Sequence, residues 1–259
     1  MDRLFPAIHP PHKPARRVVA IVQSRMGSHR FPGKAMETLG GIPILELILR
    51  RVRQAVTVTE VVLATTERLE DQVLCKLAES LQLRVVRGPE LDVLGRFGLA
   101  TKLFAAEVVV RIAGDNPFVA PEEIDRVVEH HFLTGADYSF NHIPALDNGY
   151  PDGLGAEVVE QSILEHLDES CTKPAHREHV TSYMWDNPEE FYIEAVPAPP
   201  SIIGPDIKLD INEPQDLAHL KQLVASAPPD LENWSAEDVV RAYRSEFASE
   251  LHSPGSRPL

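Results

Sequence analysis

A run of basic and small residues near the start of the chain has the composition of a phosphate-binding loop. Residues 23–34 read QSRMGSHRFPGK, and the residues with suitable chemistry are Arg25, Arg30, Lys34, Gly27, Gly33 and Ser28. Arginine and lysine neutralise phosphate oxygens, and glycines let backbone N–H groups approach them closely. No acidic residue occurs from Arg3 to Met36, although the formal net charge of the whole protein is −14. The loop therefore predicts a compact site for a polyanion such as a triphosphate.

Two common phosphate motifs do not fit this loop. The dinucleotide pattern GxGxxG is absent, because only Gly27 and Gly33 occur here. A Walker A motif needs four residues between its glycines and a Ser or Thr after its lysine, whereas five residues lie between these glycines and Ala35 follows Lys34. A solvated basic loop is the remaining alternative, and the position of the loop directly after an apolar run argues against it.

Carboxylates near predicted strand ends are candidates for a metal site. Asp115 stands in AGDNP after the apolar run EVVVRI, and Asp210 alternates with Asn212 in KLDINEP, so the two side chains of that pair should face the same way. Mg²⁺ takes a few protein oxygens and completes its shell with phosphate and water. A single Asp at a strand end is more often a turn former or a helix cap. Combined with the basic loop, these groups nevertheless predict a magnesium-triphosphate site.

Alternating strand and helix patterns supply a scaffold for these groups. Short β-branched runs are followed by amphipathic patterns, which indicates an α/β fold with a Rossmann-like, mostly parallel sheet. The predicted strands are Val18–Gln23, Glu60–Thr65, Leu83–Arg87, Glu107–Ile112, Asp137–Asn141, Ala156–Val159, Phe191–Val196 and Ile207–Ile211. Ligands bind at the carboxyl ends of strands in such a sheet. The basic loop and Asp115 are therefore expected at the same edge.

Prolines, caps and apolar spacing mark the predicted helices. Proline is tolerated at the first helical position, because its missing N–H has no helical partner there. The predicted helices begin at Pro43 and at Pro121, cover Leu69–Leu81 and His176–Asp186, begin at Pro214, and run from a cap at Ser235 and Asp238 through Phe247.

Length predicts one domain, since 259 residues suffice for one large core and no internal repeat or second core is visible. We expect a disordered leader over residues 1–17, a single α/β domain over 18–250 and a disordered tail over 251–259. A small inserted lobe is predicted at 142–200, where a loop rich in Pro, Gly and Asp interrupts the regular pattern.

Composition excludes several classes of protein. The net charge of −14 argues against nucleic acid as the main partner. No apolar run is long enough for a membrane span or a secretory core, which predicts a cytoplasmic protein. Two cysteines, Cys75 and Cys171, are too few for a disulfide framework or a zinc site.

Several stretches of the chain, in their order, resemble the CMP-sugar synthetase superfamily, and most closely its spore-coat polysaccharide cytidylyltransferase branch. They are IVQSRMGSHRFPGK, LGGIPILELILRRV, VVLATTERLEDQ, VVRGPELDVLGRF, VVVRIAGDNPFV, YPDGLGAEVV, HREHVTSYMWDNPEEF and LDINEPQDL, spanning roughly residues 18–220. The resemblance implies a nucleotide-binding fold of the GT-A type, CTP and a small-molecule acceptor as partners, Mg²⁺ as cofactor, and a homodimer.

The same resemblance implies roles for individual residues. The implied catalytic residues are Arg25, Lys34, Asp115 and Asp210, and the implied metal ligands are Asp115, Asp210 and Asn212. The implied nucleotide contacts are Gln23, Ser24, Arg25, Gly27, Ser28, Arg30, Lys34, Thr65, Thr66, Arg87, Asp92, Arg96 and Gly114.

The chain departs from the family pattern at a few positions. Asn212 stands where many relatives carry a metal-binding aspartate, so metal binding would depend more on Asp210. Ala113 and Asn116 replace a Thr and a Cys that are common in the spore-coat branch. Gly155 replaces an Asp of the PDGLDVE segment, which leaves the acceptor open.

The segments YPDG and HREH are the candidates for acceptor contacts. The predicted contacts are Asn141, Tyr150, Asp152, Glu157, Arg177, Glu178 and His179. We expect Arg177 to bind an anionic group and Glu178 to orient it or to cap a helix. His176 and His179 have the spacing of a zinc pair, but no third nitrogen or sulfur ligand lies nearby in the sequence. A purely structural role for the HREH cluster is the other alternative.

Together these features predict a CTP-dependent cytidylyltransferase. It would activate a sugar acid or a similar small anionic acceptor as its CMP derivative and release pyrophosphate, by positioning and electrostatics without a covalent enzyme intermediate. Two alternatives stay open. One is a glycosyltransferase of the GT-A type, for which AGDNP supplies only one Asp of a DxD-like motif. The other is a nucleotide-binding homologue without turnover.

Overall fold

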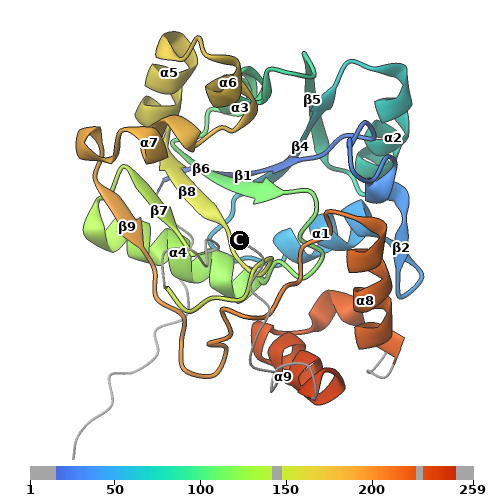
Figure 1. Ribbon diagram of the computed structural model, residues 1–259. Coiled ribbons are helices and arrows are strands. Elements are labelled where there is room, and N and C mark those ends of the chain that lie inside the picture. The colour runs from blue at the N-terminus through green and yellow to red at the C-terminus, as the bar shows by residue number, and fades with distance from the viewer. Residues whose placement is uncertain (1–15, 142–147, 226–229, 249–259) are drawn as a thin grey trace, which may run out of the picture.

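A mixed sheet of seven strands with helices on both faces forms the centre of the protein (Figure 1). The computed structural model describes residues 16–141, 148–225 and 230–248. The strands of the sheet are β1 (Val18–Gln23), β4 (Glu60–Thr66), β5 (Arg84–Gly88), β6 (Val108–Ala113), β7 (Tyr138–Phe140), β8 (Glu157–Glu160) and β9 (Ile193–Ala195). They lie in the order β5-β4-β1-β6-β8-β7-β9. Strand β8 is antiparallel to β6 and β7, whereas the other neighbouring pairs are parallel, which confirms the predicted mostly parallel α/β fold.

The remaining elements surround this sheet. Strands β2 (Thr38–Leu39) and β3 (Ile42–Pro43) pair as a small antiparallel sheet. The helices are α1 (Ile44–Val52), α2 (Gln72–Ser80), α3 (Val93–Leu103), α4 (Pro121–Thr134), α5 (Gln161–Ser170), α6 (Pro174–Glu178), α7 (Ser182–Asp186), α8 (Pro214–Ala225) and α9 (Ala236–Glu246). Short 3₁₀ turns are η1 (Lys34–Met36), η2 (Leu69–Asp71), η4 (Pro188–Glu190) and η5 (Leu231–Asn233).

Each face of the sheet packs against its own apolar cluster. In strand β1, Val18, Ala20 and Val22 face one cluster, and Val19 and Ile21 face the other. Helices α1, α4, α8 and α9 cover the first face, whereas α3 and α5 cover the second (Figure 1). A strand buried on both faces needs a continuous apolar run, which explains why VVAIVQ lacks the alternation of a half-exposed strand.

One helix that the sequence predicts is divided into two helices in the structure. The sequence predicts a single helix over His176–Asp186, but the structure contains α6 and α7 with a break between them. The backbone at His179 is extended, with φ −111° and ψ 91°. Buried Val180 follows it and packs into the apolar cluster beneath α3. The extended backbone at His179 thus ends the first helix just before this buried side chain.

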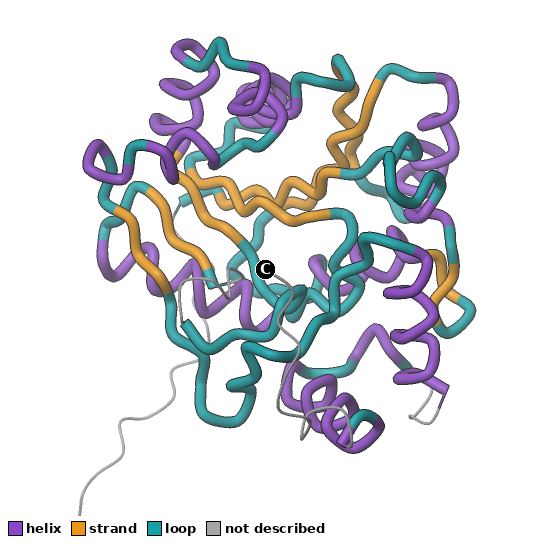
Figure 2. Tube along the Cα trace, viewed as in Figure 1, coloured by secondary structure: helices purple, strands orange, loops and turns teal. Residues whose placement is uncertain are grey.

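The predicted strand Ile207–Ile211 is wrong. This segment is loop (Figure 2), and it pairs with the segment around Asp152 through a single parallel bridge to Lys208. The amide of Leu209 donates to the carbonyl of Asp152 at 2.9 Å. Ile207, Leu209 and Ile211 are buried while Lys208 is exposed, and this alternation produces the pattern of a strand outside the sheet.

Strands β8 and β9 come from the stretch predicted as a lobe, and both belong to the main sheet. The lobe boundaries at 142–200 remain a prediction. Residues 142–147, most of the predicted leader and most of the predicted tail lie outside the described residues.

A buried arginine connects three segments on one face of the sheet. Arg51 on α1 is fully buried, and its guanidinium donates to the carbonyl oxygens of Val119 at 2.9 Å and Leu231 at 2.8 Å. Burial lowers the pKa of Arg51 to about 10, so the group keeps its charge at neutral pH. It holds the segment after β6 against the chain that leads into α9.

A second polar junction lies at the end of β8. Glu160 accepts hydrogen bonds from the guanidinium of Arg16 at 2.6 and 2.7 Å, and Nε2 of the buried His131 on α4 lies 3.1 Å from it. Burial by itself would raise the pKa of Glu160, but the hydrogen bonds with Arg16 and His131 outweigh burial and lower it from 4.5 to about 2. Because the folded-state pKa is depressed, the carboxylate stabilises the fold above its unfolded pKa and loses this contribution as pH falls toward 2.

We predict that Glu160→Gln lowers the free energy of unfolding by about 2 kcal/mol at pH 7, and that the difference from wild type shrinks as pH falls from about 4.5 toward 2. Urea unfolding at a series of pH values measures this. Glu129→Gln, at an exposed position of α4, is the matched control and should change the free energy of unfolding by less than about 0.5 kcal/mol. A difference that stays constant down to pH 2 would contradict the assigned role of Glu160.

Candidate active site

A cleft of about 390 Å³ opens beside the carboxyl ends of β1 and β6. The predicted site residues that line it are Gln23, Ser24, Arg25, Ser28, Arg30, Lys34, Arg96, Gly114, Asp115, Glu178, His179 and Asn212. Ala113, noted above as a departure from the family pattern, also lines it, together with His29, Val93 and Arg111, which the sequence analysis did not single out. The cleft therefore brings together residues from distant parts of the chain.

Strands β1 and β6 are neighbours, and their ends approach each other closely at Gly114. A Cβ at this position would lie 2.3 Å from the carbonyl oxygen of Gln23 and 2.8 Å from Cβ of Ser24. Both distances are far below van der Waals contact, so only glycine fits here. Gly114 thereby lets Asp115 lie directly beside the basic loop.

Lys34 connects the basic loop to both carboxylate-bearing segments. Its Nζ lies 2.8 Å from Oδ2 of Asp115 and 2.6 Å from the carbonyl oxygen of Ile211. The amide of Ile211 donates to the carbonyl of Asp115 at 2.9 Å. Arg30 donates to Oδ1 of Asn212. Cations and carboxylates that were predicted to converge thus lie at one edge of the sheet.

The carboxylate of Asp210 is only partly satisfied by hydrogen bonds, as expected of a metal ligand. Its Oδ2 accepts from the side-chain amide of Asn212, while its Oδ1 is buried and has no hydrogen-bond partner in the described part of the chain. The nearest charge to Oδ1 is Nζ of Lys208 at 3.9 Å. Burial raises the pKa of Asp210, Lys208 partly offsets this, and the negative charge of Asp115 raises it further. A cation between Asp115 and Asp210 would relieve both effects.

The loop around Gly153 fixes the backbone at Asp210. Gly153 has a φ of +95°, and a Cβ there would lie 2.9 Å from the amide nitrogen of Asp210. Only glycine combines this conformation with so close an approach. The YPDG segment therefore positions the 207–212 segment, whatever further role it has.

The oxygen donors fit a hard divalent cation such as Mg²⁺. Two carboxylates and an amide oxygen are the ligands such ions prefer, and a buried carboxylate oxygen lacking a hydrogen-bond partner is available for one. Within the described ranges, no group of three or more His, Cys, Asp or Glu is arranged to hold a metal. Asp115, Asp210 and Asn212 would thus need further ligands, such as phosphate oxygens. The HxxH zinc alternative gains no support, because buried His176 is paired with Asp186 at 2.8 Å.

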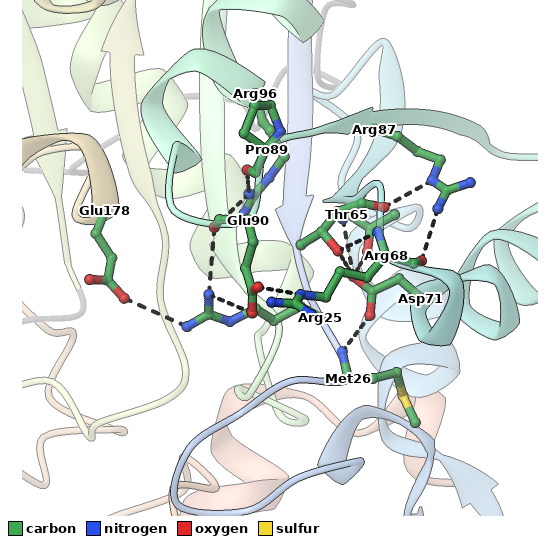
Figure 3. A network of polar contacts seen from close by, with 11 residues as sticks. Arg25, Met26, Thr65, Arg68, Asp71, Arg87, Pro89, Glu90, Arg96 and Glu178 are labelled. Atoms are coloured by element: carbon green, nitrogen blue, oxygen red, sulfur yellow. Dashed lines mark hydrogen bonds and ion pairs between the residues drawn. The ribbon is translucent and has the colours of Figure 1, made fainter. Parts of the chain in front are cut away.

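Arg25 also lines the cleft, and it lies between two carboxylates (Figure 3). Its guanidinium is 3.5 Å from Oε1 of Glu90 and 3.6 Å from Oε1 of Glu178 on α6. Arg96 is only 3% exposed, and its NH1 donates to the carbonyls of Pro89 and Glu90 at 2.5 and 3.0 Å. Burial and the nearby charge of Arg25 lower the pKa of Arg96. Two guanidinium groups close together favour an anion in this part of the cleft.

A buried carboxylate that the sequence analysis missed holds the start of the basic loop. Asp71 is 1% exposed, and it accepts from the amide of Met26 at 2.7 Å, from the amide of Thr66 at 3.2 Å and from Oγ1 of Thr65 at 3.2 Å (Figure 3). The hydroxyl of Thr66 also donates to it. Its place in TTERLED, five residues after Thr66, is the only sequence signal, and that spacing is too common to be informative.

The predicted nucleoside contacts outside the cleft lining make internal contacts. Thr65 and Thr66 are buried against Asp71, and Arg87 donates to the carbonyls of Thr66 and Arg68, both at 2.9 Å. Asp92 caps α3 by accepting from the amide of Gly95. Gly27 likewise lies outside the lining. Direct contact of these residues with a nucleotide remains a prediction.

Most predicted acceptor contacts are also held by other protein groups. Asn141 is fully buried and accepts from the amide of Ala156 at 2.7 Å. Tyr150 is fully buried and donates to Glu123 at 2.5 Å, and burial followed by that hydrogen bond raises its pKa. Asp152 makes the backbone bridge to the 207–212 segment.

Arg177 does not point into the cleft but joins α6 to two other helices. It pairs with Asp92 at the start of α3 and with Asp168 on α5, at 2.6 and 2.8 Å. A role in binding an acceptor anion therefore remains a prediction, whereas its neighbours Glu178 and His179 line the cleft.

Arg111 is a cleft residue that the sequence analysis missed. It lies on β6, pairs with buried Glu157 on β8, and donates from Nε to the side-chain oxygen of Gln23 at 3.1 Å. Because that contact occupies the oxygen of Gln23, its amide donors are left for other partners. The signal was present in VVVRIAGD, where a single cation interrupts an apolar strand.

Fold and site together define an α/β protein with a cation-lined cleft at the carboxyl ends of its strands. The sequence profile of the cytidylyltransferase family matches residues 19–247. The chain belongs to this family and is a cytidylyltransferase, one of the nucleotidyltransferases.

Named relatives agree with this assignment. The spore coat polysaccharide biosynthesis protein SpsF of Bacillus subtilis is 32% identical over 215 residues, which cover 81% of this chain and 87% of that protein. The 3-deoxy-manno-octulosonate cytidylyltransferase of Desulfosudis oleivorans is 32% identical over 117 residues, covering 43% and 46% of the two chains.

Solved structures share the fold. A cytidylyltransferase from Leptospira borgpetersenii superposes with a TM-score of 0.83 at 25% identity, over 93% of this chain and 100% of that chain. A CMP:2-keto-3-deoxy-manno-octonic acid synthetase complexed with CTP gives 0.61 at 16% identity, over 81% and 98%. The Rv0371c protein of Mycobacterium tuberculosis, in complex with manganese, gives 0.56 at 16% identity, over 79% and 97%. Among the described helices, none is both long and apolar enough to cross a membrane.

We predict that Asp71→Ala lowers the free energy of unfolding by about 2 to 3 kcal/mol, because it leaves the buried donors of Met26 and Thr66 without an acceptor. Amide hydrogen exchange at Met26 should accelerate more than global unfolding explains. Urea unfolding and exchange mass spectrometry measure the two effects. Glu67→Ala, at an exposed position on the same loop, is the control. Unaltered exchange at Met26 would show that Asp71 does not hold the loop.

Proposed function

We propose that this protein transfers CMP from CTP to a small anionic acceptor, such as a sugar acid, and releases pyrophosphate. The observation that carries the proposal is the meeting of Lys34 and Arg30 with Asp115, Asp210 and Asn212 at the carboxyl edge of the sheet. Support also comes from the fold shared with a synthetase that was solved with CTP.

The cations divide the cleft into two regions that suit a nucleoside triphosphate. Lys34 contacts Asp115 and Arg30 contacts Asn212, whereas Arg25 lies 3.5 Å from Glu90 and Arg96 donates to the backbone carbonyl of Glu90. Positive groups at both ends can neutralise successive phosphates, and cations at fixed positions stabilise charge that develops on the reacting phosphorus.

Asp115, Asp210 and the side-chain oxygen of Asn212 would hold a divalent cation, for which we propose Mg²⁺. A relative of the same fold was solved with manganese. Such a cation, when bound, would neutralise charge on the triphosphate and on the pyrophosphate that leaves.

The chain itself positions the reactants and supplies the remaining groups. An acceptor oxygen would attack the α-phosphorus in line as the bond to the β-phosphate oxygen breaks, and the protein gains by holding the two in place. Glu178 and His179 line the cleft beside Arg25, and each has an atom that can accept the proton of an attacking hydroxyl.

Arg111 and Gln23 favour an acceptor with several oxygens. Arg111 lines the cleft, and the amide donors of Gln23 remain for a ligand because its oxygen is bonded to Arg111. Hydrogen-bond donors of this kind recognise carboxylate, keto and hydroxyl oxygens, as a sugar acid carries. The name of SpsF places that relative in polysaccharide synthesis, and we propose a comparable use of the product here. Homodimer formation and a cytoplasmic location remain predictions.

Pyrophosphate release tests the proposal. With CTP, Mg²⁺ and a pool of sugar acids that includes 3-deoxy-manno-octulosonate, wild type should release pyrophosphate. Asp115→Asn should lower turnover at least about 100-fold with little change in Tm, because it removes the negative charge of one cation ligand but keeps the shape of the side chain. Removing the metal with EDTA should stop the reaction.

Asp206→Asn, at an exposed position, is the matched control and should retain wild-type turnover. Full activity of Asp115→Asn would refute the site. Transfer from a nucleotide sugar without pyrophosphate release would instead favour a glycosyltransferase, and CTP binding without product from any acceptor would favour a homologue that lacks turnover.

A further inference from the structure

The ammonium group of Lys34 contacts Asp115, one of the ligands assigned to the divalent cation, and the backbone between the other two. It lies 2.8 Å from a carboxylate oxygen of Asp115 and 2.6 Å from the carbonyl oxygen of Ile211. Ile211 stands between Asp210 and Asn212 in the chain. The lysine side chain is 13% exposed and that of Asp115 is 30% exposed, so this ion pair is shielded more than a surface pair is.

A divalent ion and this ammonium group compete for the negative charge of Asp115. Two cations about 3 to 4 Å apart repel each other strongly at the effective dielectric constant of a partly buried site. The charge of Asp115 is therefore already compensated by the chain itself. Free metal therefore meets the positive charge of Lys34 when it approaches this carboxylate.

Arg30 is in the opposite situation. Its described side-chain partner is the neutral oxygen of Asn212, and no carboxylate of the described ranges pairs with it. A cation whose charge is not neutralised by the protein attracts phosphate, while a carboxylate that already has a cation attracts metal weakly. The charges at this end of the cleft thus favour the arrival of an anion before a free cation.

We propose that Lys34 fills the cation position at Asp115 until a nucleotide binds, so that the protein takes up the divalent ion together with the triphosphate. The ammonium group then leaves Asp115 for a phosphate oxygen, which its flexible four-carbon stem permits. Asp115 becomes available to the metal in the same event. This inference deepens the proposed function and rests on it for the identity of the anion as CTP.

Binding of Mn²⁺ to the nucleotide-free protein tests the first half, with free Mn²⁺ followed by electron paramagnetic resonance. Lys34→Gln should bind Mn²⁺ about tenfold more tightly than wild type, within the usual range of coupling between neighbouring charges. Lys34→Arg keeps the charge and should stay close to wild type. Lys102→Gln removes the same charge from an exposed position of α3 and should change the affinity by less than about twofold.

Calorimetry with CTP in the presence of EDTA tests the second half. Lys34→Gln should bind metal-free CTP about tenfold more weakly, so that one substitution moves the two affinities in opposite directions. In the double variant Lys34→Gln/Asp115→Asn the gain in Mn²⁺ affinity should disappear, which would place the ion at Asp115.

Mn²⁺ binding by Lys34→Gln that is no tighter than in wild type would overturn the proposal. Tighter Mn²⁺ binding by Lys34→Arg would also overturn it, since the charge is then not the cause. Unchanged affinity of Lys34→Gln for CTP would refute the transfer of Lys34 to phosphate. If wild type fails to bind CTP, the proposed function fails, whereas the Mn²⁺ titrations still decide whether Lys34 excludes free metal.

Discussion

The contact between Lys34, Asp115 and Ile211 is the constraint on which the site depends. It joins residues 81 and 177 positions apart in the chain. Ordering such distant segments costs conformational entropy that one ion pair cannot offset. The burial of Ile207, Leu209 and Ile211 beside the loop at Gly153 stabilises this arrangement more than the ion pair does. Lys34 then sets the final position of this segment relative to Asp115.

Two buried charged residues hold the partners of this contact in place. Arg51 binds the carbonyl of Val119, four residues after Asp115, and connects it to the chain before α9. Asp71 binds the amide of Met26 at the start of the basic loop and connects it to the end of β4. Arg51 joins backbone carbonyls of two segments, and Asp71 joins a loop amide to the end of a strand. This explains how a cleft made of loops keeps a defined shape within a sheet protein.

The sequence was sufficient to predict the sheet and the part of the cleft that contains Lys34. Apolar runs identify strands buried on both faces, and parallel strands place their following loops at one edge, so proximity of Lys34 to Asp115 follows from order along the chain. The helix α3 escaped prediction because it is buried on most sides, and Gly95 and Gly98 interrupt its apolar pattern. The segment Ile207–Ile211 was misassigned because alternation reports burial of every second residue, not membership of a sheet.

The acceptor side was harder to predict for a different physical reason. Polar residues such as Asn141, Tyr150 and Arg177 have the right types for binding, but each is satisfied by protein groups. Residue type alone cannot tell whether a donor faces a ligand or a neighbouring helix. Arg111 is the converse case, since a cation in an apolar strand marks a strand end that meets a cleft.

The balance of charge in the cleft explains how a protein with a net charge of −14 keeps an anion site. Arg25 is paired with Glu90 and Glu178, Lys34 with Asp115, and Arg96 with backbone carbonyls. Such pairing keeps the cations from repelling one another in the folded protein without a ligand. Under the proposed function, a triphosphate with its metal would supply the same charges in another arrangement, with phosphate oxygens in place of the carboxylates and the metal in place of the lysine. Such binding would exchange partners instead of adding uncompensated charge, and this would favour a ligand that brings its own cation.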